Sequence, residues 1–316
     1  MTDSIPLYIV SKGRADSRLT SKALESMNVP YFIVIEKQEY PAYSAVIDSK
    51  KILILDPKYQ EQYETCDNLG DTKSKGPGAA RNFVWDHSIN EGHKWHWVMD
   101  DNIRRFVRYN KNEQLTVKSD KIFRAMEDFV QRYTNISMAG PNYFMFIPRK
   151  SGSKKHPPFV KNTRIYSCNL IRNDVPYRWR GRYNEDTDLS LRMLKDKWCT
   201  IQFNAFLQEK MTTQLIKGGN TKEFYANEGT YAKSQMQVQL HPDVSRLAWR
   251  FGRIHHYVDY NPFKKTKLHK KKDVAIPSAP NEYGMVRIEL KDEKDAQANY
   301  KTSRTSPNAG NHRHAT

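Results

Sequence analysis

The sequence predicts an α/β fold in which a central mixed sheet is flanked by helices. Short apolar runs at 7–10, 31–35 and 52–55 have the length and composition of strands. Between the first two runs, residues 17–27 repeat apolar side chains at the spacing of a helix that buries one face. Because strands and helices alternate in this way, a doubly wound sheet is the expected arrangement.

The same patterns place the later elements in order. A segment of small residues, Gly76-Pro77-Gly78-Ala79-Ala80, opens a helix that is expected to run to about residue 90, and an apolar strand follows at 95–99. Beyond it we expect a helix at 119–133, a strand pair or bent strand at 136–147, strands at 164–171 and 199–206, a helix after 184–186 and another at 228–240. Loops are expected at 59–75 and 150–161, and a turn at 217–221.

The charge balance indicates a polyanionic partner. The chain of 316 residues contains 52 Lys and Arg against 35 Asp and Glu, a net charge of +17. Twelve basic and six acidic residues follow Pro262, so +11 remains on the preceding chain and the tail does not account for the balance. Nucleic acid, an anionic membrane surface and a phosphorylated substrate are the classes of partner that such a charge favours. We expect a folded domain over 1–260 and a basic, poorly ordered tail over 261–316.

Cysteine usage and hydropathy predict a soluble protein of a reducing compartment, the cytoplasm. The three cysteines, Cys66, Cys168 and Cys199, show no zinc or disulfide spacing. No apolar run is long enough to span a bilayer, and the N-terminus lacks the pattern of a signal peptide.

A group of hard oxygen ligands ends the strand at 95–99. Asp100, Asp101 and Asn102 follow the apolar run directly. At the carboxyl edge of an open α/β sheet, carboxylate and amide oxygens are well placed to hold a divalent cation such as Mg²⁺, whose other ligands are water and substrate phosphates. A turn or a helix N-cap is the alternative interpretation of the same residues.

Two segments have features of a phosphate-binding site. Ser11 and Arg14 lie in a polar turn after the first strand, and Arg81 and Asn82 follow the small residues that open the second helix. A helix N-terminus favours anions through its free N–H donors. Neither segment matches a P-loop or a dinucleotide fingerprint, so ordinary connections are the alternative.

An Arg-rich aromatic stretch precedes a second acidic group. Arg178, Trp179, Arg180 and Arg182 are interleaved with tyrosines, as in grooves where arginines contact phosphate and aromatic rings stack on bases. Directly after them, Glu185 and Asp186 open a helix. Such carboxylates are commonly dipole partners of the helix, but beside an acceptor groove one of them is well placed to act as general base. Further along, His255 is a candidate metal ligand, with a packed or surface histidine as the alternative.

The order of these motifs resembles the GT-A glycosyltransferases and, more closely, the TET-associated glycosyltransferases of phages. Three motifs carry the resemblance to the wider fold: Ala79-Ala80-Arg81-Asn82, Asp100-Asp101-Asn102 and Asn184-Glu185-Asp186. The match to the phage enzymes covers roughly residues 5–260, and its stretches are 9–24, 96–103, 142–151, 177–192, 198–206, 218–221 and 255–260. The resemblance implies a GT-A-like fold.

The implied reaction is transfer of a sugar from a nucleotide-sugar, usually a UDP-sugar with Mn²⁺ or Mg²⁺, to the hydroxymethyl group of 5-hydroxymethylcytosine or 5-hydroxymethyluracil in DNA. By the same resemblance, Ser11, Arg14, Arg81 and Asn82 should bind the nucleotide end and Asp100 the donor ribose or sugar. Asp101 or Asn102 should hold the cation, with His255 as a further ligand. The third position of the DxD-type motif is Asn102, which carries no charge, so a weaker metal site is expected.

For catalysis and acceptor binding, Asp186, or else Glu185, should deprotonate the acceptor hydroxyl, and Arg178, Trp179, Arg180 and Arg182 should bind DNA. Two other enzyme classes remain open: a glycosyltransferase with a glycan, lipid or protein acceptor, and a metal-dependent nuclease whose carboxylates cluster around metal ions. A non-catalytic DNA-binding protein is the third alternative.

Overall fold

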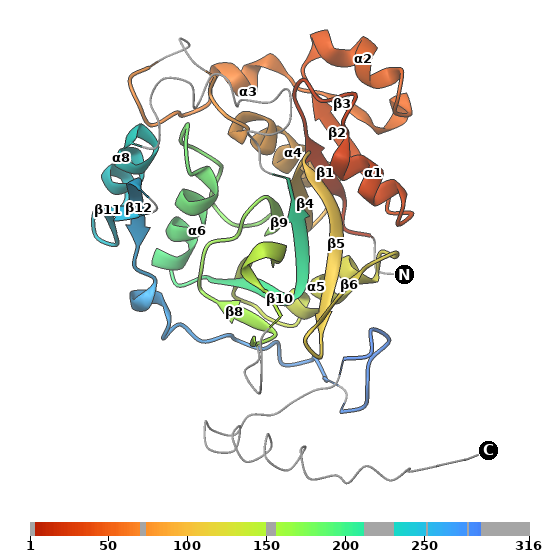
Figure 1. The fold of residues 1–316 in the computed structure, drawn as a ribbon, viewed down its shortest axis with the longest axis vertical. Coiled ribbons are helices and arrows are strands. Elements are labelled where there is room, and N and C mark those ends of the chain that lie inside the picture. The colour runs from red at the N-terminus through yellow and green to blue at the C-terminus, as the bar shows by residue number, and fades with distance from the viewer. Residues whose placement is uncertain are drawn as a thin grey trace, which may run out of the picture. The chain divides into compact units, whose positions relative to one another are not determined.

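The computed structural model describes residues 4–69, 74–149, 156–211, 231–250, 252–276 and 278–285 (Figure 1). The strands are β1 Leu7–Val10, β2 Phe32–Ile35, β3 Ile52–Ile54, β4 Trp95–Asp100, β5 Ile103–Asn110, β6 Glu113–Thr116, β7 Ile136–Tyr143, β8 Phe159–Lys161, β9 Cys168–Arg172, β10 Cys199–Lys210, β11 Ser245–Arg250 and β12 Arg253–Val258. The helices are α1 Leu19–Glu25, α2 Tyr40–Ser44, α3 Pro57–Glu61, α4 Gly78–Asn90, α5 Lys121–Gln131, α6 Glu185–Lys195 and α8 Tyr231–Leu240.

A mixed sheet forms the centre of the described fold. Its strands lie in the order β3-β2-β1-β4-β9-β7-β10-β5-β6, and β8 pairs with β10. Strands β1 to β4 are parallel, whereas β9 is antiparallel to β4 and β5 is antiparallel to β10. The predicted α/β class, with a central mixed sheet and flanking helices, is therefore confirmed.

Strand β4 is covered on both faces, which explains its continuous apolar sequence. His96 packs against Trp85 of α4, with ring centroids 5.2 Å apart, while the next residue, Trp97, packs against Phe123 of α5 at 5.3 Å. Successive side chains of a strand point to opposite faces, so α4 and α5 lie on opposite sides of the sheet. The indole N–H of Trp97 donates to Glu127 of α5 at 2.8 Å, which satisfies the one polar atom of this buried ring.

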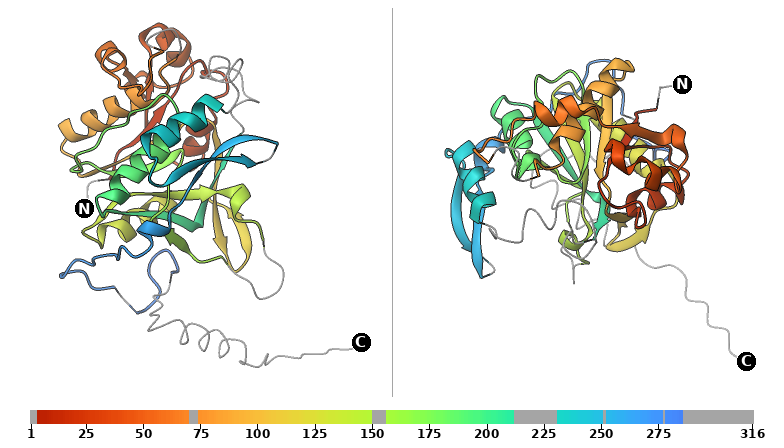
Figure 2. Two further views of the ribbon diagram at one scale, coloured as in Figure 1. Left: turned by 90° about the vertical axis from the view of Figure 1, so that its left-hand side faces the viewer. Right: turned by 90° about the horizontal axis from the view of Figure 1, so that it is seen from above.

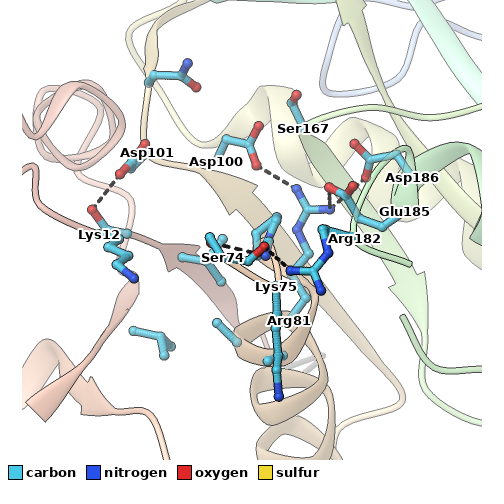
Figure 3. A pocket seen from close by; sticks show the side chains of 18 of the residues that line it. Lys12, Ser74, Lys75, Arg81, Asp100, Asp101, Ser167, Arg182, Glu185 and Asp186 are labelled. Carbon is cyan, nitrogen blue, oxygen red and sulfur yellow. Dashed lines mark hydrogen bonds and ion pairs between the residues drawn. The ribbon is translucent and has the colours of Figure 1, made fainter. Parts of the chain in front are cut away.

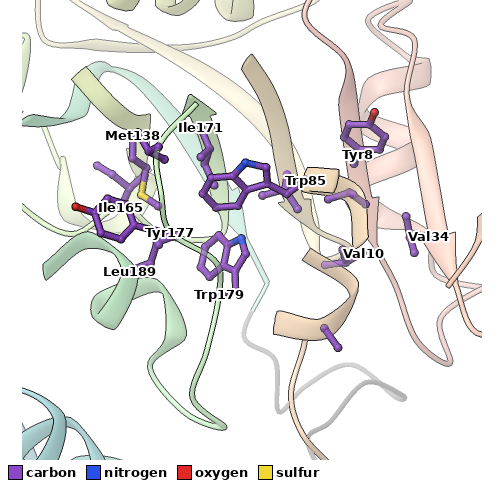
Figure 4. Close-up of a cluster of buried hydrophobic side chains, with 14 of the residues drawn as sticks. Tyr8, Val10, Val34, Trp85, Met138, Ile165, Ile171, Tyr177, Trp179 and Leu189 are labelled. Atoms are coloured by element: carbon purple, nitrogen blue, oxygen red, sulfur yellow. The ribbon is translucent and has the colours of Figure 1, made fainter. Parts of the chain in front are cut away.

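The largest part of the core lies between α4 and the strands beneath it (Figure 4). Trp85 is fully buried there between side chains of the first strands, such as Tyr8, and side chains of the later half, such as Ile171 and Trp179. Residues from both halves of the chain therefore share one core, which fixes the ends of β1 and β4 relative to α6.

The order of the first strands creates a switch point. From β1 the chain moves outward to β2 and β3, and then returns to the other side of β1 to form β4. The crevice between the carboxyl ends of β1 and β4 is therefore the place where an open α/β sheet binds its ligands.

Several boundaries differ from those expected. The first helix begins only at Leu19, because Arg18 adopts a left-handed conformation (φ 42°). The strand expected at 164–171 begins at Cys168, since Ser167 also has a positive φ. Strand β10 continues to Lys210 rather than ending at 206. Helix α3 occupies part of the loop expected at 59–75, and the strands β5, β6, β11 and β12 were not expected. The turn expected at 217–221 lies outside the described residues.

The compact body extends to Lys272, beyond the boundary expected at residue 260. Phe263 is buried, the Asn135 side chain donates to the carbonyl of Lys267 at 2.8 Å, and Lys270 forms a β-bridge with Tyr133. The first part of the predicted tail thus belongs to the folded domain. Residues 273–316 form a second unit, most of which lies outside the described residues. In the described parts of the chain, no helix combines the length and apolarity needed to cross a bilayer.

Candidate active site

A cavity of about 660 Å³ is lined by residues at the carboxyl ends of β1, β2 and β4 (Figure 3). Val10, Val34 and Leu55 supply apolar lining, and polar residues converge on the cavity from β4, α4, α6 and β10. This volume is in the range of small-molecule sites, which combine an apolar lining with a few placed polar groups.

Arg81 joins the three motifs that the sequence keeps far apart. Its guanidinium, only 2% exposed, donates to Asp100 at 2.7 Å, to Glu185 at 3.1 Å and to Asp186 at 3.0 Å. It also lies over the ring of Trp179, 4.5 Å from the centroid. Since a buried charge requires partners, Arg81 holds the end of β4 and the start of α6 together.

Glu185 and Asp186 occupy the first turn of α6. Asn184 is the N-cap residue, with a left-handed backbone and no capping hydrogen bond from its side chain. Both carboxylates line the cavity and accept hydrogen bonds from Arg81. Figure 3 shows the two side chains on the same side of the cavity as Arg81. Both carboxylates therefore belong to the ion-paired group around Arg81 at the cavity, and they do not serve only as caps of the helix.

A second cation, Lys210, reaches the same cluster from β10. Its ammonium lies 2.5 Å from Asp100 Oδ2 and donates to Ser167 Oγ at 2.8 Å. Burial lowers the pKa of Lys210, but the Asp100 carboxylate outweighs it, and the pKa is raised above its usual value. Burial likewise raises the pKa of Asp100, but Lys210 and Arg81 together hold it well below its usual range. Asp100 and Lys210 are therefore ionised at neutral pH.

Asp186 has the opposite electrostatic environment. Burial raises its pKa to about 7; Arg81 opposes the shift, and the neighbouring charges of Glu185 and Asp100 add to it. Its Oδ1 atom also accepts a long hydrogen bond of 3.4 Å from Asn169. Two carboxyl groups that share Arg81 thus differ in proton affinity, and carboxyl groups with pKa values shifted apart are common in enzyme active sites.

Ser11, Arg14 and Asp101 form a separate group on the β1 side of the cavity. Arg14 forms an ion pair with Asp101, and Ser11 donates to Asp101 at 2.7 Å. Tyr43 of α2 shares a hydrogen bond of 2.6 Å with Ser11. The structure thus brings together the three predicted residues Ser11, Arg14 and Asp101, and all three line the cavity. Tyr43 was not predicted and does not line the cavity.

In this arrangement the predicted metal ligands already contact other groups of the protein. Arg14 and Ser11 occupy the carboxylate of Asp101, Arg81 and Lys210 occupy that of Asp100, and the amide of Asn102 donates to the carbonyl of Met211 at 2.9 Å. Among the described residues, no group of three or more His, Cys, Asp and Glu is arranged to hold a metal ion.

His255, the further metal ligand expected, lies on β12. It is not among the residues that line the cavity, and its Nε2 atom lies 3.0 Å from Arg253 Nε. The structure therefore does not bring His255 together with Asp101 and Asn102. The prediction that these residues bind a cation stays untested.

Two residues of the α4 segment have structural roles. Both ends of the Asn82 amide bond the backbone of Trp179, at 2.9 and 2.8 Å, so Asn82 positions that segment and is not among the cavity-lining residues. At Gly78, an added Cβ would lie 1.9 Å from the hydroxyl of Tyr63. Gly78 is therefore required for the packing of Tyr63, whereas the neighbouring Ala79 and Ala80 face the cavity.

The Arg-rich stretch is not the exposed groove that the sequence suggested. Trp179 is 2% exposed beneath Arg81, so its ring cannot stack on a base in this structure. Arg178 pairs with Asp86 at 2.9 Å, Arg180 with Asp188 at 3.2 Å and Arg182 with Asp67 at 2.7 Å. Of these three arginines, Arg182 is buried and lines the cavity. Each of the three arginines therefore has an acidic partner within the protein, and their contact with DNA stays a prediction.

Lys210 and Ser167 were not predicted as site residues, because the start of β9 and the end of β10 were predicted at the wrong positions. The apolar run of β10 fades after Phe206, so its last four residues, Leu207–Lys210 in the sequence, lacked a strand signal. Ser167 has a positive φ, and no local sequence pattern predicts that backbone conformation. One signal could have identified Lys210: it is a lysine at the end of a strand, and β4 ends in an acidic residue, Asp100, at the same edge of the sheet.

Together these features define an α/β protein with an ion-paired ligand site at the switch point of its sheet. The chain belongs to the TET-Associated Glycosyltransferase family, whose sequence model matches residues 5–219. Membership makes it a glycosyltransferase linked to TET-related DNA modification, and it implies a DNA substrate and a nucleotide-sugar donor. No curated protein matches the chain.

Proposed function

We propose that the protein transfers a sugar from a nucleotide-sugar, a UDP-sugar, to the hydroxymethyl group of 5-hydroxymethylcytosine or 5-hydroxymethyluracil in phage DNA, on a GT-A-like fold. One observation carries the proposal. In a member of a glycosyltransferase family, Arg81 gathers Asp100, Glu185 and Asp186 at one cavity on the switch point of the sheet.

The donor fits the part of the cavity between β1, β2 and α4. Val10, Val34 and Leu55 offer an apolar surface for a nucleoside, with Ser11 and Arg14 beside it. The first turn of α4 faces the same cavity through Ala79 and Ala80, and its unpaired backbone N–H groups favour a diphosphate. This orientation directs the sugar towards Asp100 and Asp186.

Asp186 is the proposed general base. It takes the proton of the acceptor hydroxymethyl group as that oxygen attacks the anomeric carbon, and the bond from that carbon to the diphosphate oxygen breaks with its electron pair remaining on the nucleoside diphosphate. A single displacement of this kind inverts the anomeric carbon. Glu185, 3.1 Å from the same guanidinium, is the competing base, but the raised pKa favours Asp186 because its carboxylate binds a proton more readily.

Lys210 and Arg81 are placed to oppose the negative charge that develops on the leaving diphosphate. Both contact Asp100 at the edge of the cavity, and a preorganised cation there requires no rearrangement during the reaction. The predicted Mn²⁺ or Mg²⁺ would supply the same charge neutralisation. Because the Asp100 and Asp101 carboxylates are already ion-paired, no step is assigned to a metal.

A nuclease is less well supported than a glycosyltransferase. Metal-dependent nucleases cluster carboxylates around shared ions, whereas here the four carboxylates of the predicted motifs each pair with Arg or Lys of the protein, namely Asp100, Asp101, Glu185 and Asp186. A glycosyltransferase with a non-DNA acceptor uses the same donor site, and only the acceptor distinguishes it.

Calorimetric titration with UDP and UDP-sugars, followed by a transfer assay on DNA that contains hydroxymethylated pyrimidines, separates these classes. Binding of UDP together with a mass gain on one nucleoside supports the proposal. Binding of UDP without transfer to DNA would indicate a different acceptor, and loss of intact DNA without UDP binding would indicate a nuclease.

A further inference from the structure

The strands β11 and β12 form a two-stranded ribbon that carries cationic and aromatic residues. Arg246 pairs with Tyr257, Ala248 with His255 and Arg250 with Arg253 across the ribbon. Directly opposed residues share a face, so these side chains lie together on one face. The guanidinium groups of Arg246 and Arg250 lie over the ring of Tyr257, at 5.0 and 5.2 Å.

The charge of this ribbon is not neutralised within the described protein. The segment from Ser245 to Val258 contains no acidic residue. In the described chain, Arg246, Arg250 and Arg253 are exposed and form no ion pair with a carboxylate. The arginines of the earlier Arg-rich stretch provide the contrast, because each has an acidic partner, such as Asp86 for Arg178.

Trp249 is the most exposed large apolar side chain of the ribbon. It is 72% exposed, and its neighbour Leu247 on the same strand is 40% exposed. A tryptophan this exposed on a solvent-facing strand is uncommon, because its ring places a large apolar area in contact with water. Because successive residues of a strand point to opposite faces, Trp249 lies on the face opposite that of Arg246 and Arg250. The ribbon therefore presents cations on one face and an exposed ring on the other. A nucleic acid that receives the ribbon can contact both faces, with phosphates against the cations and a base against the ring.

The ribbon is connected to the cavity through α8. Helix α8 packs against both β11 and β12, and the views of Figure 2 show the three elements side by side at the margin of the body. Lys233 of α8 lines the cavity, and its carbonyl accepts a hydrogen bond of 2.7 Å from Asn184, the residue before Glu185. One helix thus separates the ribbon from the proposed general base.

We propose that the β11–β12 ribbon is the DNA-binding element of this protein. The inference rests on the proposed DNA acceptor, and it concerns residues outside the part of the chain that the family model matches, 5–219. Arg246, Arg250 and Arg253 contact phosphates, and Trp249 contacts bases beside the target nucleotide. A two-stranded ribbon has the width to enter the major groove of a duplex, and stacking on Trp249 offsets part of the cost of exposing the target base.

The test measures binding of unmodified duplex and single-stranded DNA by fluorescence anisotropy over a range of salt concentrations. The variant R246A/R250A/R253A should bind about tenfold or more weakly, and its plot of log affinity against log salt should be shallower by about one for each lost phosphate contact. The matched control K50A/K94A/K121A removes the same charge from three exposed lysines elsewhere on the body and should keep the wild-type slope. Trp249→Ala should weaken binding without changing the slope, because it removes stacking and not charge.

A second measurement uses only the wild-type protein, so its result does not depend on whether the variants fold. Hydrogen exchange of the wild-type protein should slow in residues 245–258 when DNA is added. A wild-type slope in R246A/R250A/R253A, or exchange in 245–258 that DNA does not alter, would overturn the proposal. Binding of the ribbon to vesicles of anionic lipid with no binding of DNA would overturn it in favour of a membrane surface.

These outcomes are separate from those of the proposed reaction. Unmodified DNA requires no chemistry, so the ribbon is tested even if no sugar is transferred. Failure of the wild-type protein to modify any acceptor would contradict the proposed function and leave the measured binding surface intact.

Discussion

Lys210 at the end of β10 and Asp100 at the end of β4 form an ion pair of 2.5 Å across the carboxyl edge of the sheet. The two strands are separated in the sheet by β9 and β7, and the two residues by 110 positions in the sequence. Asp100 also accepts from Arg81, so two cations of the protein meet at one carboxylate beside the cavity.

Replacement of Lys210 tests whether this cation acts in the reaction. Lys210→Met should lower kcat by about 10²- to 10³-fold, the range observed when one preorganised electrostatic group is removed, and should change KM for the donor less. Lys210→Arg should restore part of the rate because it keeps the charge. Steady-state kinetics of both variants provide the measurement; an unchanged kcat in Lys210→Met would show that the lysine only balances the charge of Asp100.

Asp186→Asn should abolish transfer while leaving donor binding nearly unchanged. An amide cannot accept the proton of the acceptor, and the loss of a general base costs about 10²- to 10⁴-fold in rate. Glu185→Gln is the matched control, since Glu185 contacts the same arginine. Transfer rates and UDP titrations should be measured together. If Glu185→Gln is the inactive variant and Asp186→Asn retains activity, the two assignments must be exchanged.

The pH dependence follows from the raised pKa of Asp186, about 7 in the free protein. Below that pH the carboxyl group is protonated and cannot act as a base, so kcat/KM should fall as the pH decreases through 7 and level off above it. Asp100 and Lys210 stay ionised over the same range because their pKa values are shifted away from it. The profile should be measured from about pH 5 to pH 9. A flat profile across neutrality would argue against Asp186 as the base.

Trp179→Ala should lower the stability of the protein, and a folded variant at this position should bind DNA as tightly as the wild-type protein does. The ring is buried and packs beneath Arg81, so truncation leaves a cavity and costs about 3–5 kcal/mol of unfolding free energy. Chemical denaturation measures this loss. Trp179→Phe, which retains most of the volume, should be considerably more stable than Trp179→Ala. Weaker DNA binding by the folded Trp179→Phe variant would instead indicate that this ring contacts DNA.

The sequence was sufficient to predict the fold class and several of the residues that meet at the cavity, although Lys210 and Ser167 were missed. The apolar run that ends in Asp100 and Asp101, and the acidic start of α6, are local patterns, and family resemblance placed them in one site. Their partners depend on tertiary structure. Nothing near Arg81 in the sequence indicates that it binds Asp100 and Asp186 at once.

The Arg-rich stretch illustrates the limit of local patterns most clearly. Interleaved arginines and aromatics look the same in a DNA groove and in a buried network, and only the distant Asp67, Asp86 and Asp188 distinguish the two. The β11–β12 ribbon has a similar composition but no acidic partner among the described residues. Distinguishing these segments requires the positions of carboxylates that are far away in sequence.

The central claim is best tested by mass analysis of nucleosides from DNA incubated with the protein and nucleotide-sugars. Duplexes that contain hydroxymethylcytosine, hydroxymethyluracil or neither should be treated with the wild-type protein and with Asp186→Asn, then digested to nucleosides. We predict a gain of one sugar residue on one hydroxymethylated nucleoside, with the wild-type protein only. If no nucleoside gains mass with any donor while UDP still binds, DNA is not the acceptor; if UDP also fails to bind, the assignment of the cavity as a sugar-donor site is contradicted.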